Sequence, residues 1–362
     1  MTFSGSYDPA DVQFLLEPID MAPTAIPERE KLIQSGERHY SELLAPEIVP
    51  SAEYLELYQR ALERNKLRMA KAIAALAKRI ALEKPKTPVV VSLARAGTPI
   101  GVLLRRALEE LACEVVHYSI SIIRGRGIDE NALMHILNLH SDEDILFVDG
   151  WTGKGAIGRE LREAIGRFNS NHGTRLPESL TVLTDLAGIA GLAVDGEDYL
   201  IPSSILNSII SGLISRSVLN NKYLKKNGFH GCVFYRENRD RDISRKFVDE
   251  LTLAVLPLLK DEELNPAVWN DTNRLERAKL TKEFVSAIAL EHGINDINRV
   301  KPGIGEATRA VLRRVPERVI LNSESHEDLK HLAHLARSKS VPIELSYSMP
   351  FQATAIIKKL GQ

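Results

Sequence analysis

The sequence predicts an α/β protein in which helices cover a mostly parallel sheet. Short apolar, β-rich runs alternate with helical patterns along most of the 362 residues, the order typical of a doubly wound sheet. Runs such as TPVVVSL (Thr87–Leu93) are apolar on both faces, as strands between two layers of helices are. Some of these strands end in short glycine-bearing loops that open a helix, typical of the edge at which such sheets bind ligands.

Residues 1–50 are predicted to be an N-terminal extension, because Pro18, Pro23 and Pro27 interrupt regular structure. A long helix is expected over Ser51–Leu82, since Ser51 can cap it and its apolar residues form a stripe. Alternating strands and helices then predict a first domain over 51–262. Its strands are expected at Thr87–Leu93, Glu114–Ile123, Ile145–Val148, Leu180–Leu186 and Gly231–Tyr235. Its helices are expected at Thr98–Leu111, Glu130–Asn138, Ala156–Phe168, Ser203–Leu219 and Asp242–Leu259, and a loop at Arg124–Asp129.

The polar stretch Lys260–Asn273 predicts a domain boundary. The alternation restarts after it, and about 90 residues are enough for a small α/β/α sandwich, which we predict over 274–362. Its strands are expected at Asn298–Val300, Arg318–Leu321 and Pro342–Ser346. Its helices are expected at Leu275–His292, Glu327–Ser338 and Phe351–Leu360, and a turn that opens a helix at Lys301–Arg314.

Composition narrows the class of protein. A formal net charge of −1 provides no overall basic field, so any contact with nucleic acid must be local. Two cysteines, Cys113 and Cys232, argue against a disulfide framework and favour a reducing compartment. No apolar run approaches the roughly 20 residues of a membrane span. We therefore expect a cytoplasmic protein without a membrane partner.

The stretch DILFVDGWTGKGAI (Asp144–Ile157) is the strongest candidate for a binding site. A buried strand runs into a glycine-rich turn and then into a helix, an arrangement in which free N–H groups and the helix dipole favour an anion. Asp149 stands at the carboxyl end of the strand, where it can accept hydrogen bonds from sugar hydroxyls or orient Mg²⁺ through water. The groups expected to hold a phosphate are Thr152, Gly153, Lys154 and Gly155.

Two further loops are expected beside this turn. The first is Arg95, Ala96 and Gly97, in which glycine permits close backbone approach and the arginine can fork onto a pyrophosphate. The second carries Arg124 and Arg126. A phosphorylated sugar with a pyrophosphate leaving group fits the three loops together.

The pattern resembles a type I phosphoribosyltransferase. The pyrophosphate loop is SLARAGTPIG (Ser92–Gly101) and the ribose-phosphate motif is ILFVDGWTGKGAI. More narrowly, the chain resembles the StiP-like family of tellurite-resistance and stress gene clusters. The segments that carry this match cover most of residues 4–250 and are SGSYDPADVQFLL, GERHYSELL, HYSISIIRGRGIDENAL, EDYLIPSSILNSIISGLISRSVLN and HGCVFYRENRDRDIS.

The resemblance implies a phosphoribosyltransferase-like sheet followed by a pelota-type RNA-binding domain. It further implies an enzyme that binds phosphoribosyl diphosphate or a nucleotide-like ligand with substrate-bound Mg²⁺ and makes or breaks an N-glycosidic bond. Asp149, Arg95 and Arg124 are then the expected catalytic residues, and Arg126 contacts the pyrophosphate. A homodimer is a further expectation.

Two alternatives stay open. Most phosphoribosyltransferases carry two adjacent acidic residues before the phosphate turn, whereas here Val148 and Gly150 flank Asp149. A non-catalytic protein that senses a nucleotide and binds RNA is therefore the first alternative. The second is a cysteine protease, a label that the family has carried, with Cys232 beside His230 on one face of a strand.

The C-terminal segment KPGIGEATRAVLRR (Lys301–Arg314) resembles the turn and helix with which pelota and K-turn-binding ribosomal proteins contact RNA. Gly305 replaces the usual asparagine, which removes one base-reading side chain. Contacts to RNA phosphates need only charge and N–H groups, so backbone contact remains expected. The residues predicted to bind RNA are Lys301, Gly303, Glu306, Arg309 and Arg313.

Overall fold

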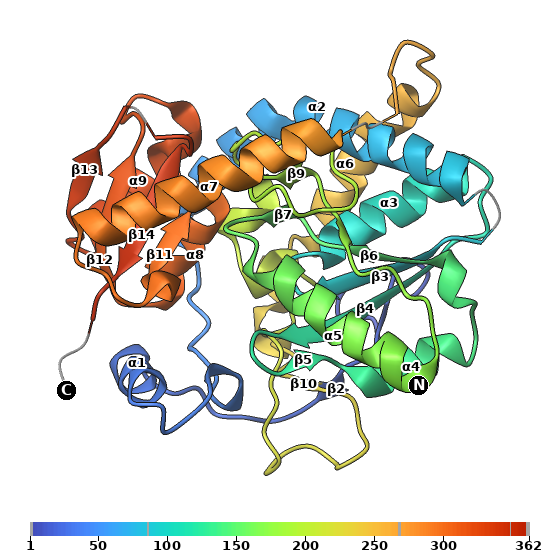
Figure 1. Ribbon diagram of the computed structural model, residues 1–362, viewed down its shortest axis with the longest axis horizontal. Coiled ribbons are helices and arrows are strands. Elements are labelled where there is room, and N and C mark those ends of the chain that lie inside the picture. The colour runs from blue at the N-terminus through green and yellow to red at the C-terminus, as the bar shows by residue number, and fades with distance from the viewer. Residues whose placement is uncertain (1–2, 85–86, 267–268, 348, 360–362) are drawn as a thin grey trace.

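The computed structural model describes residues 3–84, 87–266, 269–347 and 349–359 (Figure 1). Its larger part is built on a sheet with the strand order β1-β4-β3-β6-β8, in which every neighbouring pair is parallel. A short strand, β5, pairs antiparallel with β4. The strands are β1 Gln13–Phe14, β3 Val89–Ala94, β4 Val116–Ile123, β5 Gly127–Ile128, β6 Ile145–Val148 and β8 Leu180–Thr181. The predicted mixed α/β fold with a parallel sheet is confirmed, whereas its likeness to phosphoribosyltransferases stays a prediction.

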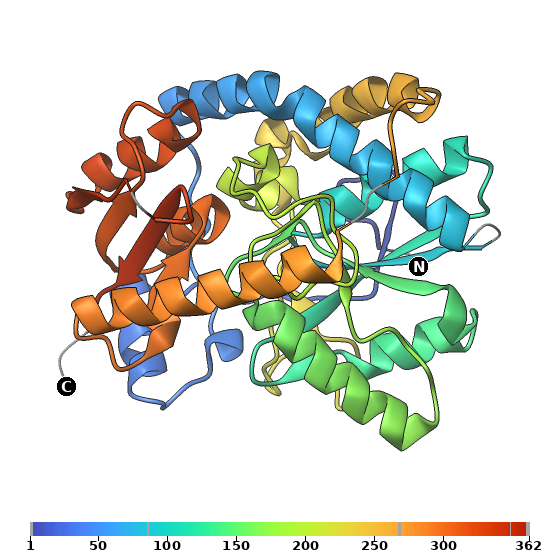
Figure 2. The same ribbon diagram turned by 45° about the horizontal axis from the view of Figure 1, so that its top comes forward.

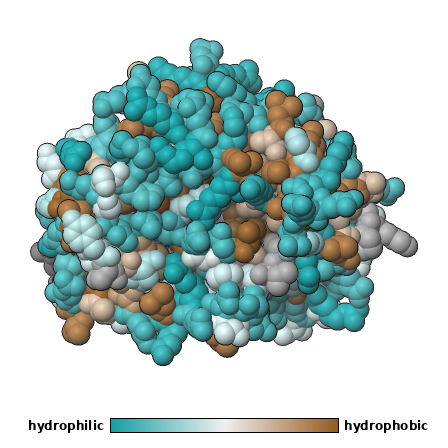
Figure 3. Space-filling view, turned by 90° about the horizontal axis from the view of Figure 1, so that it is seen from above, coloured by the Kyte–Doolittle hydropathy of each residue, from teal (hydrophilic) through white to brown (hydrophobic). Residues whose placement is uncertain are grey.

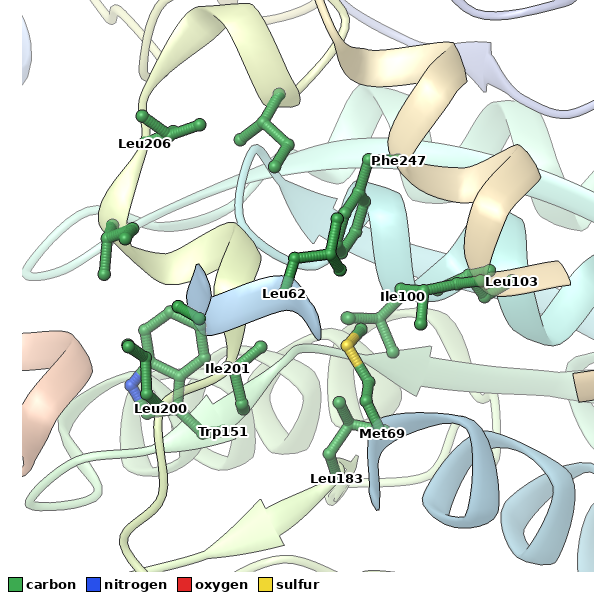
Figure 4. Packing of buried hydrophobic residues seen from close by; sticks show 14 of the residues in the cluster. Leu62, Met69, Ile100, Leu103, Trp151, Leu183, Leu200, Ile201, Leu206 and Phe247 are labelled. Atoms are coloured by element: carbon green, nitrogen blue, oxygen red, sulfur yellow. The ribbon is translucent and has the colours of Figure 1, made fainter. Parts of the chain in front are cut away.

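Helices cover both faces of this sheet (Figures 1 and 2). One face meets α2 (Ala52–Glu83), α3 (Thr98–Glu110) and α6 (Ser244–Leu259), which contact one another, and the other meets α4 (Glu130–Leu137) and α5 (Ala156–His172). Side chains alternate between the faces, so that Val90 joins the core with α2 and α3 while Val89 and Val91 join the core with α4 and α5. Figure 4 shows the first of these cores around Leu62, Met69 and Phe247.

Two pairs of very short strands lie beside the main sheet. Strand β2 (Glu17–Pro18) pairs parallel with β10 (Gly231–Cys232), and β7 (Trp151–Thr152) pairs parallel with β9 (Thr184–Asp185). The first fifty residues also form the helix α1 (Ile26–Gln34), and their strand β1 joins the main sheet, so this segment belongs to the body of the protein.

The C-terminal part has a mixed sheet with the order β11-β14-β12-β13. Its core with α7 on one face is separate, but the core with α8 and α9 on the other face runs on into the core of the larger part. The two parts therefore share buried apolar surface, and α7 lies along both of them (Figures 1 and 2). The elements are α7 Asp271–Glu291, β11 Val300–Pro302, α8 Ile304–Arg313, β12 Pro316–Leu321, α9 Lys330–Ser338, β13 Ile343–Leu345 and β14 Ala353–Ile357.

Two predicted helices are wrong. The segment predicted as the helix Phe351–Leu360 contains strand β14, since a five-residue apolar run can be helix or strand and the pairing with β11 and β12 decides; residue 360 lies outside the described residues. The segment Ser203–Leu219 forms only two short 3₁₀ helices, Pro202–Ile205 and Ser208–Ile210. Leu213 has a positive φ of 59°, which no α-helix accommodates.

The surface seen from above is mostly hydrophilic, and its apolar residues are scattered in small groups (Figure 3). Scattered exposed apolar side chains are ordinary on folded proteins and carry no functional signal. In the part of the chain that the structure describes, no helix has both the length and the apolar character that a membrane crossing requires.

Candidate functional site

The glycine turn after β6 has the predicted local form. Strand β6 ends at Val148, the N–H of Gly150 donates to the Asp149 carboxylate (2.8 Å), and α5 begins at Ala156. Gly155 precedes the helix with a φ of 79°, a conformation that L side chains rarely adopt. The strand, turn and helix therefore form as the sequence predicts, because each depends only on neighbouring residues.

The turn is covered by helix α8 of the C-terminal part. A Cβ atom on Gly153 would lie 2.5 Å from the side chain of Glu306, and one on Gly305 would lie 2.5 Å from the indole of Trp151. The Arg309 guanidinium stacks over the Trp151 ring, 4.3 Å from its centroid. Both glycines thus permit close contact between the two parts. The groups predicted to hold a phosphate and those predicted to hold RNA cover one another.

Asp149 lies at this contact and carries a perturbed acidity. Burial raises the pKa of Asp149 from 3.8 to about 6, against the lowering effects of Arg309 and of the Gly150 N–H. Glu306 raises this pKa further, so the C-terminal part brings a second carboxylate near the first. Glu306 lies 157 positions after Asp149 in the chain, so a motif of adjacent acidic residues does not include it.

The raised pKa predicts how stability responds to pH. A carboxyl whose folded pKa lies above its unfolded pKa stabilises the fold below the unfolded value, and this contribution is lost as pH rises through the folded value. Asn at position 149 cannot ionise. Relative to wild type, Asp149→Asn should therefore gain roughly 1 kcal/mol of unfolding free energy between pH 5 and pH 8, on the basis of the pKa of about 6. Urea unfolding of both proteins at pH 5 and pH 8 measures this gain. A difference in unfolding free energy that does not change with pH would contradict the prediction.

Two lysines also lie between the parts. The Lys154 ammonium donates to the backbone oxygen of Ile297, and burial lowers its pKa to about 7, with a further contribution from Lys301. Burial likewise lowers the pKa of Lys301 to about 8. Arg124 reaches the same region, because its guanidinium donates to the side-chain oxygen of Asn298 (3.4 Å). The structure thus brings Arg124, Lys154 and Lys301 together.

Other predicted residues have contacts within the fold. The Thr152 hydroxyl donates to Asp185 (2.6 Å) and accepts the N–H of Ala187. Gly97 lies so close to β6 that a Cβ atom there would be 2.5 Å from the Val148 oxygen, which leaves no space for a ligand on that side. Arg126 forms an ion pair with Glu42 at 3.3 Å. Ala96, next to Gly97, is half-buried in the turn before α3.

The basic loop after β4 is shorter than predicted, because Gly127 and Ile128 form strand β5. The N–H groups of Gly125 and Gly127 donate to the Glu160 carboxylate at 2.6 and 2.9 Å. These N–H groups are therefore already occupied by a carboxylate of α5.

Arg95 and Arg313 share one hydrogen-bond acceptor. Both donate to the side-chain oxygen of Asn207, Arg95 through Nη2 (3.0 Å) and Arg313 through Nε (2.9 Å). Asn207 was not among the predicted site residues, since nothing in its neighbourhood in the sequence distinguishes it. The structure therefore pairs a residue predicted to bind pyrophosphate with one predicted to bind RNA.

Asp198 is a second residue that the sequence did not single out. Its carboxylate accepts the N–H of Ile304 (3.0 Å), the first residue of α8, and the N–H of Gln352 (2.8 Å). Gly303 precedes α8 with a φ of 89° and has no side chain to cap the helix. Asp198 of the larger part supplies that cap from about 100 positions away, which helps to hold the two parts together.

Both cysteines are free and buried. Cys232 is fully inaccessible, and burial raises the pKa of its thiol to about 12. The neighbouring His230 is half-buried, its Nδ1 lies 2.8 Å from the Ser121 hydroxyl, and its backbone N–H donates to Asp129 (2.6 Å). Among the described residues no hydrogen bond joins the imidazole to the sulfur. Cys113 also has a raised thiol pKa, caused by burial.

In the described ranges, no three His, Cys, Asp or Glu side chains are placed together to hold a metal ion.

Comparison with known proteins assigns both parts of the chain. Residues 5–252 match the family model described as "Tellurite-like stress resistance cysteine protease StiP", and residues 279–359 match "PELOTA RNA binding domain". A protein of Acinetobacter baylyi (strain ATCC 33305 / BD413 / ADP1) named "Cysteine protease StiP" is 42% identical over 373 aligned residues, which cover 99% of this chain and 95% of that protein.

These matches correct the predicted activity. The phosphoribosyltransferase function, the glycosyltransferase class and the associated transferase terms are wrong, because the family and the relative are both described as cysteine proteases. A glycine turn between strand and helix is a local motif that many activities share, so it does not by itself indicate a transferase. The predicted substrate-bound Mg²⁺ stays a prediction. The predicted link to tellurite and stress resistance and the pelota domain both agree with the matches.

Proposed function

The chain belongs to the StiP family, and from this premise we propose that it is a cysteine peptidase acting in stress resistance, with Cys232 as the nucleophile and His230 as its base. The observation that carries the proposal is the relative named as a cysteine protease, which is 42% identical over nearly the whole of both chains. The position of Cys232 two residues after His230 supports the choice of these side chains.

Cys232 is a better candidate than Cys113 because of the histidines near each. Both ring nitrogens of His117, the histidine closest to Cys113 in the sequence, lie 2.8 Å from other groups, the Asp11 backbone oxygen and the Ser92 hydroxyl. His230 has such a contact at Nδ1, to Ser121, and its Nε2 makes no hydrogen bond with a described residue. A base held through Nδ1 can use Nε2 to accept the thiol proton.

The described conformation is then a resting form. A thiol with a pKa of about 12 is protonated at neutral pH and is a weak nucleophile. In the active form the imidazole Nε2 would take the thiol proton, and the sulfur would attack the scissile carbonyl carbon. The imidazolium would return that proton to the leaving amine, and water would then hydrolyse the thioester. Contact with substrate must therefore bring the thiol and the imidazole together.

Alkylation by iodoacetamide tests the assignment. Modification of Cys232 should remove proteolysis of labelled casein in proportion to its extent, because each modified molecule loses its nucleophile. Cys113 is an internal control, since it is also buried and belongs to the same chain. Peptide mass spectrometry measures both sites beside activity. Full activity after complete modification of Cys232, or loss that follows Cys113 alone, would refute the assignment.

We also propose that the C-terminal part binds RNA, on the basis of its match to the pelota family over 279–359. The side chains that carry charge for phosphate contacts are Lys301, Arg309 and Arg313, whereas the N–H groups of Gly303 and Ile304 already donate within the fold. The first part of the chain covers these side chains, as the contacts of Trp151 with Arg309 and of Asn207 with Arg313 indicate. RNA binding by this face would therefore compete with the contact between the two parts.

A further inference from the structure

Three arginines from distant parts of the sequence converge beneath the segment 43–50, which connects the 3₁₀ helix Tyr40–Glu42 to α2. Arg95 follows β3, Arg216 lies between the short 3₁₀ helices and β10, and Arg313 ends α8 of the C-terminal part. They line a small pocket together with Glu47 and Asn207. In Figure 1 the connecting segment is the blue coil that rises between α1 and α2, beside α8.

In this pocket two positively charged side chains donate to one uncharged acceptor. The single oxygen of Asn207 accepts from Arg95 at 3.0 Å and from Arg313 at 2.9 Å, so one neutral oxygen bridges two cations. Two guanidinium groups held this close repel each other, and the usual acceptor between such groups is a carboxylate or a phosphate. Burial, followed by the charge of Arg95, lowers the pKa of Arg313 well below its ordinary value.

The third arginine has an unused donor. Arg216 donates through Nη2 to the backbone oxygens of Tyr40 and Leu43, which are neutral. Its Nε is buried and has no hydrogen-bond partner among the described residues. Burial and the charge of Arg29 lower its pKa to about 9. This N–H can therefore donate to a further acceptor.

Glu47 is the one carboxylate among the residues that line this pocket. Its Oε2 lies 3.6 Å from Nη1 of Arg95, and its Oε1 accepts the N–H of Ser208 (2.6 Å). The remaining pocket has a volume of about 20 Å³, which is enough for a single water molecule. Glu47 therefore compensates the three arginines only in part, and its carboxylate beside Arg95 takes up space that a larger anion would need.

We propose that Arg95, Arg216, Arg313 and Asn207 form a binding site for an oxyanion, a phosphate or a carboxylate, and that Glu47 occupies its entrance in the present conformation. The anion takes the place of the Glu47 carboxylate, which turns outward with its segment of extended chain. Because Arg95 belongs to the larger part and Arg313 to the C-terminal part, the bound anion strengthens the contact between the two. This proposal does not depend on the peptidase assignment.

Thermal unfolding of the full chain tests the site. A ligand that binds only the folded protein raises its midpoint by mass action. The probes are inorganic phosphate against chloride at equal ionic strength, and a short peptide with a free C-terminal carboxylate against the same peptide amide. We expect either probe pair to raise the midpoint of wild type, and the pair that does so identifies the source of the anion.

Three variants and a control make the test specific. Glu47→Gln removes the internal competitor and should bind the anion several-fold more tightly, whereas Arg313→Met should not respond. Asn207→Asp places a carboxylate between the two arginines, so it should raise the midpoint without added anion and remove the response. Arg337→Met, on the exposed side of α9, should respond as wild type does. No response in wild type and in Glu47→Gln, an unchanged response in Arg313→Met, or a lowered midpoint in Asn207→Asp would overturn the proposal.

Discussion

Replacement of Cys232 by alanine is expected to reduce peptidase activity by roughly 10⁴-fold or more, because the nucleophile cannot be replaced by a neighbouring group. His230→Ala should lose about 10²–10⁴-fold, the range typical of a general base. The measurement is the initial rate of casein hydrolysis by each purified variant. The two losses should not add in the double variant, because the residues act as one unit.

Cys113→Ala is the matched control for this series. Cys113 is also a free, buried cysteine, so its replacement removes a core thiol without touching His230. It should keep the wild-type rate, apart from a modest loss of stability. Circular dichroism and unfolding curves of each variant separate lost catalysis from lost folding. Wild-type activity in Cys232→Ala would exclude this residue as the nucleophile.

Trp151→Ala is expected to destabilise the protein by about 3–5 kcal/mol, the usual cost of removing a large buried aromatic side chain. Trp151 is 8% exposed and packs in the core near Leu200 and Ile201 (Figure 4). It also touches Gly305 and carries the stacked Arg309. Its loss therefore weakens the contact between the two parts as well as the core. Urea unfolding measures the change, and Trp151→Phe, which keeps an aromatic ring, should lose less.

The same variant tests the proposed RNA binding. If the larger part covers the RNA-binding face, Trp151→Ala should bind bulk transfer RNA more tightly than wild type, and salt should weaken this binding. Wild type and Trp151→Phe, in which the contact is kept, are the controls. Equal affinity in all three proteins would show that RNA does not use the covered face. The absence of binding in each of them at low salt would remove the RNA-binding proposal.

Local patterns explain which elements could be predicted. Strand β6 has the predicted bounds, and α5 begins at the predicted residue Ala156, because strand, glycine turn and helix depend on a dozen neighbouring residues. The sequence predicts a helix for the segment that contains β14, because its own residues give no sign that it pairs with β11 and β12. The helix predicted over 203–219 is wrong for a similar reason, because surrounding elements impose an irregular backbone on this buried segment.

The candidate site shows the same division. The glycines of the turn were predicted to let a ligand approach, yet Gly153 and Gly97 permit contact with Glu306 and with Val148 of the protein itself. The sequence indicates that these two positions need a small residue, but it does not indicate which group comes close to them. The pair His230 and Cys232 was also visible, whereas the burial that raises the thiol pKa to about 12 was not.

The sequence by itself determined the α/β class, the family and the residues that carry charge and nucleophilic character. Periodicity, turn chemistry and family resemblance all act over short stretches of chain. Only the tertiary structure decided that α8 covers the glycine turn, that Arg95 and Arg313 share Asn207, and that Cys232 is enclosed. The physical reason is that burial and charge pairing depend on residues that are distant along the chain, and their partners are chosen only when the two parts pack together.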